Sequence, residues 1–249
     1  MLRTGNPTLR NDIFLKEHDT SSSDTMTIQG TVNKTGLLLL LTILSAAYTW
    51  GQFLNQGSSS AVLPWMGLGG IVGFILSLII IFKKQSAPKL APAYAVAQGL
   101  FLGGLSAQFE MSYPGIVLQA VGLTFGTLFC LLGAYKSGAI KVTENFKLGI
   151  AAATGGIMLF YLASFILSFF GVHLNSAFGN SPISILFSVG IVVIAALNLV
   201  LDFDFIETGA EQGAPKYMEW YAGFGLLVTL IWLYIEILRL LAKLQSRRD

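Results

Sequence analysis

Charged residues are scarce in this chain: they make up 11% of its 249 residues, against about 25% in ordinary globular proteins. Hydrophobic residues make up 54%, and the mean hydropathy is +0.69. A soluble domain of this size needs more polar surface than these residues supply, so lipid must be the solvent for most of the chain. The net charge of +2 is too small to suggest a nucleic-acid partner.

Cysteine and histidine are also rare. The single cysteine, Cys130, lies inside an apolar run, has no partner for an internal disulfide, and is expected to be a small buried hydrophobe. We expect the two histidines, His18 in the polar N-terminal segment and His173 in a loop, to be surface residues. No Cys/His spacing typical of a metal site occurs, and no cofactor is expected.

Seven apolar runs fill most of the chain, each close to the roughly 20 residues that a membrane-spanning helix needs. They are 36–54, 62–82, 90–109, 115–135, 148–172, 183–206 and 215–243. We predict an all-α membrane protein with seven transmembrane helices over residues 36–245. Residues 1–35 are expected to form a poorly ordered polar tail that ends at a helix cap near Asn33 or Thr35. The alternative is a re-entrant last run, but its length of about 43 Å favours a full span.

The distribution of Lys and Arg predicts the orientation in the membrane. Eleven of these residues lie in the tail and in alternate loops: Arg3, Arg10, Lys16, Lys34, Lys83, Lys84, Lys89, Lys136, Lys141, Lys147 and Lys216. Because basic residues concentrate on the cytoplasmic side, the N-terminal tail should be cytoplasmic. The basic C-terminal end, with Arg239, Lys243, Arg247 and Arg248, would then lie on the opposite side if the last run spans.

Glycines four residues apart predict where helices approach closely, because lipid gives no hydrophobic drive to pack them. The pairs are Gly69 with Gly73, Gly99 with Gly103, and Gly122 with Gly126. We expect all three to form helix-packing faces.

The sixth run carries a face of small and polar residues. Steps of three and four residues place Ser188, Ala195, Asn198 and Asp202 on one side, as expected for a surface that lines a bundle interior or a water-filled path. A carboxylate at membrane depth is costly, so Asp202 is the preferred functional residue. The alternative is that Asp202 is a helix-end carboxylate that simply meets water. Asp204 points to another side and is expected to reach the headgroups or to pair with Lys216.

The seventh run carries two further carboxylates. Glu219 stands near its start, and we expect it to lie level with Asp202 across the hairpin, where two close carboxylates raise one another's proton affinity. Alternatively, Glu219 is a first-turn acid favoured by the helix dipole. Thr229 lies deeper and could face the same interior. Glu236 should pair with Arg239 three residues on.

Enzyme classes find little support. An intramembrane aspartyl protease would need a second Asp in a Gly-x-Gly-Asp setting, which is absent. Ser106 has no histidine on another helix to activate it, and no lysine lies in the middle of the last run to bind retinal. We therefore predict that the protein is not an enzyme.

Three segments carry a resemblance to a known family. They are residues 118–125 (LQAVGLTF), 201–206 (LDFDFI) and 228–241 (VTLIWLYIEILRLL). In this order and spacing they resemble the Bax inhibitor family, the transmembrane Bax inhibitor motif proteins and their bacterial YccA-like relatives. The resemblance implies a bundle in which the last helix is central among the other six, and a bacterial inner membrane as location.

The resemblance also implies a function. Similar members are regarded as calcium leak channels that are gated by protonation of an aspartate pair. Asp202 corresponds to one member of that pair, and Thr229, which cannot ionise, stands at the other, where Glu219 or Asp204 could replace it. The family's basic partner corresponds to Lys83 or Lys84.

The leading hypothesis is therefore a pH-sensitive passive leak pathway for calcium or another cation. Asp202, which could bind calcium transiently, would line its inner mouth, with Glu219 as the pH-sensitive partner. The alternative is a regulator that binds other membrane machinery, such as a membrane-bound protease, through its tail. A third possibility, a proton-coupled transporter, would usually show an internal repeat, and none is clear.

Overall fold

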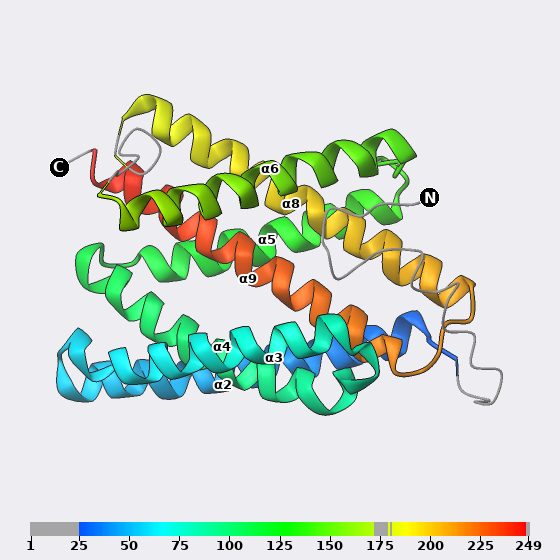
Figure 1. Ribbon diagram of the computed structural model, residues 1–249, viewed down its shortest axis with the longest axis horizontal. Coiled ribbons are helices and arrows are strands. Elements are labelled where there is room, and N and C mark those ends of the chain that lie inside the picture. The colour runs from blue at the N-terminus through cyan, green and yellow to red at the C-terminus, as the bar shows by residue number, and fades with distance from the viewer. Residues whose placement is uncertain (1–24, 172–178, 180, 248–249) are drawn as a thin grey trace. The chain divides into compact units, whose positions relative to one another are not determined.

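The computed structural model describes residues 25–171, 179 and 181–247. Both histidines and most of the predicted tail lie outside the described residues. The described part is helical, and its extended contacts are limited to one isolated bridge between Thr25 and Pro215. The long helices are α2 (Ile28–Gln56), α3 (Leu63–Phe82), α4 (Ala87–Ser112), α5 (Ile116–Lys136), α6 (Glu144–Phe169), α8 (Pro182–Glu211) and α9 (Met218–Gln245) (Figure 1).

These seven helices are all long and apolar enough to cross a membrane, which confirms the predicted number of spans. The last one is a continuous helix of 28 residues, about 42 Å at 1.5 Å per residue. A re-entrant segment would have to reverse within that length, so the alternative of a returning last run is wrong.

The first helix begins earlier than the sequence pattern indicated. Thr27 caps α2 by accepting a hydrogen bond from the Gly30 N–H, so the predicted cap near Asn33 or Thr35 is wrong. Residues 28–35 are helical although they were assigned to the polar tail. The polar residues at the start of α2 were taken for a tail because a lipid-facing helix would be apolar. Here they contact Glu219 of the protein instead.

Two compact units make up the chain, and α8 and α9 contribute to both. The described residues of the α2–α4 unit are Thr25–Val117 and Phe205–Val228. The described residues of the α5–α8 unit lie between Leu118 and Asp204 and between Thr229 and Arg247.

Small residues let α4 approach its neighbours in the α2–α4 unit. A Cβ on Gly99 would collide with the Thr42 backbone, and one on Gly103 with the Ala46 backbone, both in α2. A Cβ on Gly69 of α3 would similarly collide with the α4 backbone. The two glycine pairs on α3 and α4 are therefore packing faces, as predicted. Figure 1 shows α2, α3 and α4 side by side.

The predictions for α5 were wrong in two respects. A Cβ on Gly122 or Gly126 would meet no atom within 4 Å, so this pair is not a packing face. Cys130 is exposed, not buried. A sequence of small and apolar residues cannot tell a face that packs on protein from one that lies against lipid.

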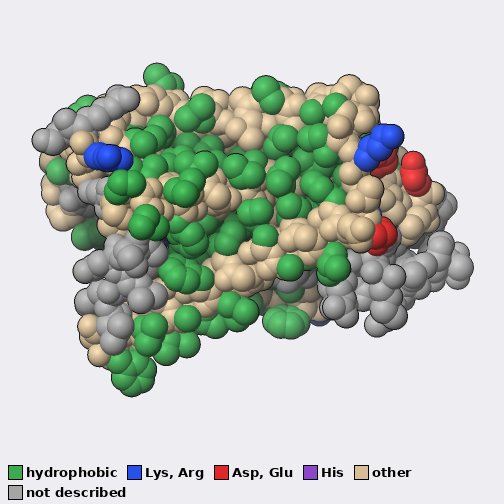
Figure 2. Space-filling view, turned by 90° about the horizontal axis from the view of Figure 1, so that it is seen from above, with side chains coloured by type: hydrophobic (Ala, Val, Ile, Leu, Met, Phe, Trp, Pro, Cys, Tyr) green, Lys and Arg blue, Asp and Glu red, His purple; other side chains and the backbone are tan. Residues whose placement is uncertain are grey.

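The last helix contacts several others. Its first turns pack on α2 and α4, where the Phe224 and Tyr94 rings lie 4.8 Å apart. Its later turns bond to α6 through Tyr161 and to α8 through Ser184. Of the seven helices it has the largest buried share, whereas the others expose many large hydrophobic side chains. The face in Figure 2 accordingly carries hydrophobic side chains over most of its length.

We predict that Gly99→Ala lowers the free energy of unfolding by about 1–3 kcal/mol relative to Gly126→Ala, because only the first new methyl group collides with a neighbouring backbone. Both changes raise helix propensity equally, so the difference isolates the collision. Thermal unfolding of the purified variants in detergent measures it. Equal unfolding temperatures would contradict the close approach.

Candidate functional site

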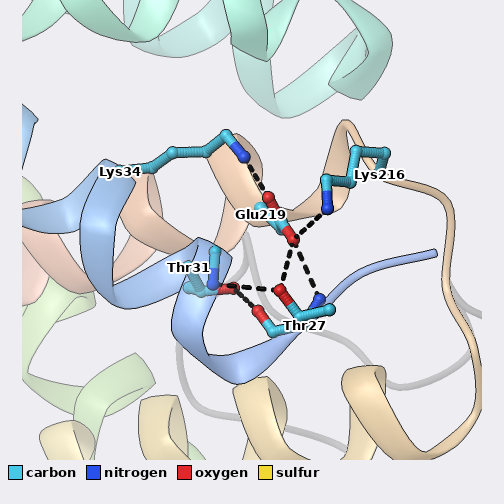
Figure 3. Close-up of polar contacts among 6 residues, drawn as sticks. Thr27, Thr31, Lys34, Lys216 and Glu219 are labelled. Carbon is cyan, nitrogen blue, oxygen red and sulfur yellow. Dashed lines mark hydrogen bonds and ion pairs between the residues drawn. The ribbon is translucent and has the colours of Figure 1, made fainter. Parts of the chain in front are cut away.

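Glu219, in the first turn of α9, is fully buried and holds the start of α2 (Figure 3). Its Oε1 accepts hydrogen bonds from the Thr27 N–H and the Thr27 hydroxyl, both at 2.9 Å. Its Oε2 pairs with the Lys34 ammonium, and the Lys216 ammonium lies 3.2 Å from Oε1. We call Thr27, Lys34, Lys216 and Glu219 the clasp.

The backbone on both sides brings the clasp together. After α8, Gly213 turns the chain with a positive φ of 65°. The Ala214 carbonyl then accepts the Met26 N–H at 2.6 Å, and Pro215 forms a bridge with Thr25. The short extended stretch before α2 is thus fixed beside the turn before α9, which sets Thr27 against Glu219.

Gly30 makes room for the Glu219 carboxylate. A Cβ at this position would collide with both carboxylate oxygens. Because the glycine has no side chain, the carboxylate lies directly against the first turn of α2. There the Thr27 hydroxyl donates to Glu219 while it accepts the Gly30 N–H, so one side chain caps the helix and binds the carboxylate.

The clasp shows what the sequence pattern did not reveal about Glu219. A first-turn acid favoured only by the helix dipole would be exposed, whereas Glu219 is buried with charged partners. Lys34 was counted as a tail charge and Lys216 as a loop charge or a partner of Asp204, and Thr27 and Gly30 were placed in the tail. Asp202 and Glu219 belong to different units, so their pairing stays a prediction.

A second polar region lies within the α5–α8 unit, along one face of α8. The buried residues of this face are Ser184, Ser188, Ile191, Ala195, Asn198 and Asp202. This confirms the predicted face, and we call it the α8 polar face. It extends over about 27 Å at 1.5 Å per residue, close to the thickness of a bilayer's hydrocarbon core.

Asp202 is fully buried and lies nine residues before the end of α8. It is therefore not a helix-end carboxylate that meets water. One turn earlier, the Asn198 amide donates to the Thr154 hydroxyl of α6 and to the Ile194 carbonyl, both at 2.8 Å. The buried amide and the buried carboxylate form the most polar part of the α8 polar face.

Helix α9 presents a matching series at seven-residue spacing: Thr229, Glu236 and Lys243. The Lys243 ammonium donates to the hydroxyls of Ser184 and Ser188, each at 2.8 Å. Since the two helices run in opposite directions, this register places Thr229 level with residues 198–202 of α8. Thr229 is buried, as predicted for a residue that faces the interior.

Glu236 is buried and pairs with Arg239 at 3.1 Å, which confirms the predicted partner. The structure adds Tyr161 of α6, whose hydroxyl donates to Glu236 at 3.0 Å and whose ring lies under the Arg239 guanidinium. Such pairing offsets much of the cost of a carboxylate at membrane depth.

Asp204 pairs with Lys147 of α6 at 2.7 Å, so the predicted pairing with Lys216 is wrong. Lys216 belongs to the clasp instead. Lys147 is buried although it is charged and lies near the start of α6, and its ammonium also lies 3.8 Å from Glu144. Alternate polar and apolar residues around the start of α6 gave no signal of this burial.

The remaining predicted residues are Lys83 and Lys84, at the end of α3. Lys83 is exposed and Lys84 is half-buried, and both belong to the α2–α4 unit. Their proposed partnership with Asp202 stays a prediction. Across the described residues, no three His, Cys, Asp or Glu side chains gather in a way that could hold a metal ion.

Comparison with known families assigns the chain. A family model described as Bax inhibitor 1 like matches residues 6–246, nearly the whole length. The chain belongs to the Bax inhibitor 1 like family. This confirms the family resemblance seen in the sequence, and with the seven apolar helices it makes the protein a multi-pass membrane protein. No curated protein and no solved structure matches the chain.

We predict that Glu219→Gln lowers the free energy of unfolding by about 1.5–3 kcal/mol, because a neutral amide loses the charge-assisted bonds to Thr27, Lys34 and Lys216. Thermal unfolding in detergent measures the loss. The matched control is Glu211→Gln, which removes an exposed carboxylate from the end of α8 and should change stability by less than about 0.5 kcal/mol. Equal effects of the two changes would contradict a stabilising clasp.

Proposed function

We propose that this Bax inhibitor 1 like protein is a pH-sensitive passive leak pathway for calcium or another cation. The observation that carries the proposal is the α8 polar face, which ends in the buried carboxylate of Asp202. Buried carboxylates in membrane proteins commonly mark ion pathways and proton relays, because their cost is otherwise selected against.

The chemistry of the α8 polar face suits a cation. Carboxylate, amide and hydroxyl oxygens are the ligands that calcium prefers, and Asp202, Asn198 and Thr229 supply one of each at a common level. A leak needs ligands that bind the ion weakly enough to release it. A single carboxylate with neutral oxygens meets that requirement better than a cluster of acids.

We assign the pH sensitivity to Asp202. Both Glu219 oxygens already accept bonds from lysines and Thr27, so its role as pH-sensitive partner becomes secondary in this proposal. Glu219 instead anchors the start of α9 to α2. The pairing of Asp202 with Glu219 across the hairpin stays part of the proposal.

The proposed location is a bacterial inner membrane with a cytoplasmic N-terminus. The orientation rests on the eleven Lys and Arg residues of the tail and alternate loops. With seven spans, the basic end of α9 then faces the other side.

The second candidate function is a non-transporting regulator of other membrane machinery, such as a membrane-bound protease. The clasp favours this regulator specifically, because it joins Thr27 and Lys34, which belong to the predicted tail, to the last helix. A partner that pulls on the tail would act on α9 through Thr27 and Glu219.

We predict that purified protein in liposomes admits calcium at a rate that varies between about pH 6 and pH 8, and that Asp202→Asn removes the variation, because an amide cannot titrate in this range. A calcium-sensitive dye inside the liposomes records the entry. Glu211→Gln is the matched control, since it removes an exposed carboxylate from the same helix and should keep the native pH profile.

No entry above protein-free liposomes at any pH would overturn the leak and favour the regulator. Deletion of residues 1–24 separates the two functions further. The deletion stops before Thr25 so that the Thr25–Pro215 bridge and the clasp are retained. It should leave the leak intact, whereas it should abolish the effect of a tail-dependent regulator.

A further inference from the structure

The end of the α8 polar face opposite Asp202 is occupied by a cation that belongs to the protein. The Lys243 ammonium donates to the Ser184 and Ser188 hydroxyls at 2.8 Å, with the Ser184 carbonyl at 3.4 Å. Ser184 and Ser188 are both buried. Three neutral oxygens thus surround one positive charge in the first turns of α8.

A lysine is an unusual side chain for this position. The N-terminal end of a helix carries a partial positive charge, which disfavours a cation nearby. Lys243 lies there nevertheless, at the last turn of α9, and three oxygens hold it. Glu236, two turns back on the same helix face, offsets part of this electrostatic cost.

The two ends of the α8 polar face therefore differ in the charge that a passing ion would meet. Asp202 provides a negative charge at one end, whereas Lys243 and Arg239 provide positive charges near the other. A compact ammonium group occupies the oxygens that a free cation would need there. A second cation could enter these ligands only after Lys243 leaves them.

We propose that Lys243 is a tethered cation that blocks the Ser184–Ser188 end of the leak pathway and so sets its resting rate. The inference rests on the proposed leak function and adds the residue that restrains it. The Ser184 and Ser188 oxygens form the position at which Lys243 and a permeant cation compete.

The test compares Lys243→Met with Arg247→Met in liposomes. Calcium is added outside, and a calcium-sensitive dye inside records its entry. Each change removes one positive charge near the end of α9, but Arg247 is an exposed residue beyond the helix. We expect Lys243→Met to raise calcium entry about tenfold, which corresponds to a barrier about 1.4 kcal/mol lower. Arg247→Met should keep the native rate.

Two further variants guard against a misfolded protein. Lys243→Arg keeps the charge and should stay near the native rate. Ser184→Ala combined with Ser188→Ala removes two of the three oxygens from the ammonium and from the permeant cation alike, so it should not raise the rate as Lys243→Met does. Monodisperse elution in detergent shows that each variant is folded.

The outcomes separate the two proposals. If the native protein leaks and Lys243→Met leaks no faster than Arg247→Met, the blocking role is overturned and the leak function stands. If the native protein and Lys243→Met both fail to exceed protein-free liposomes, the leak function is overturned and the block with it. Native entry that is slow but above protein-free liposomes, beside much faster entry through Lys243→Met, would support both.

Discussion

Lipid offers no hydrogen bonds, so every polar side chain buried in this protein depends on another part of the chain. The chain meets this constraint in two regions. In the α2–α4 unit, Glu219 gathers two lysines and a helix cap, and in the α5–α8 unit a polar face on α8 bonds to α6 and α9. The packing of apolar side chains surrounds these contacts, but it does not specify them. The polar contacts specify which helix turns face each other.

The two regions serve different purposes in the proposed function. The clasp joins the beginning of the described chain to its last helix and carries no polar path of its own. The α8 polar face extends along a helix for about the thickness of a hydrocarbon core, with a carboxylate near one end and an ammonium group at the other. In the proposed function, the clasp anchors the last helix, and the α8 polar face supplies the path and the lysine that slows the leak.

The sequence predicted what depends on local pattern. Seven apolar runs gave seven helices, and steps of three and four residues gave the buried face that contains Asn198 and Asp202. The clasp was missed because Thr27 and Lys34 lie 192 and 185 residues before Glu219, beyond the reach of any periodicity. The partner of Asp204 was missed for the same reason. The Gly122–Gly126 pair was misassigned because composition does not distinguish lipid from protein as a neighbour.

Thr27 has a consequence for how the protein is made. Its hydroxyl accepts the Gly30 N–H within α2 but also donates to Glu219, which is synthesised 192 residues later. The first helix therefore enters the membrane before the carboxylate that completes its start exists. The carboxylate that pairs with Lys34 likewise belongs to α9, so Lys34 is synthesised before its partner. The same contacts complete the first and the last helix, so a chain truncated before α9 also lacks the partner of Thr27 and Lys34 at its beginning.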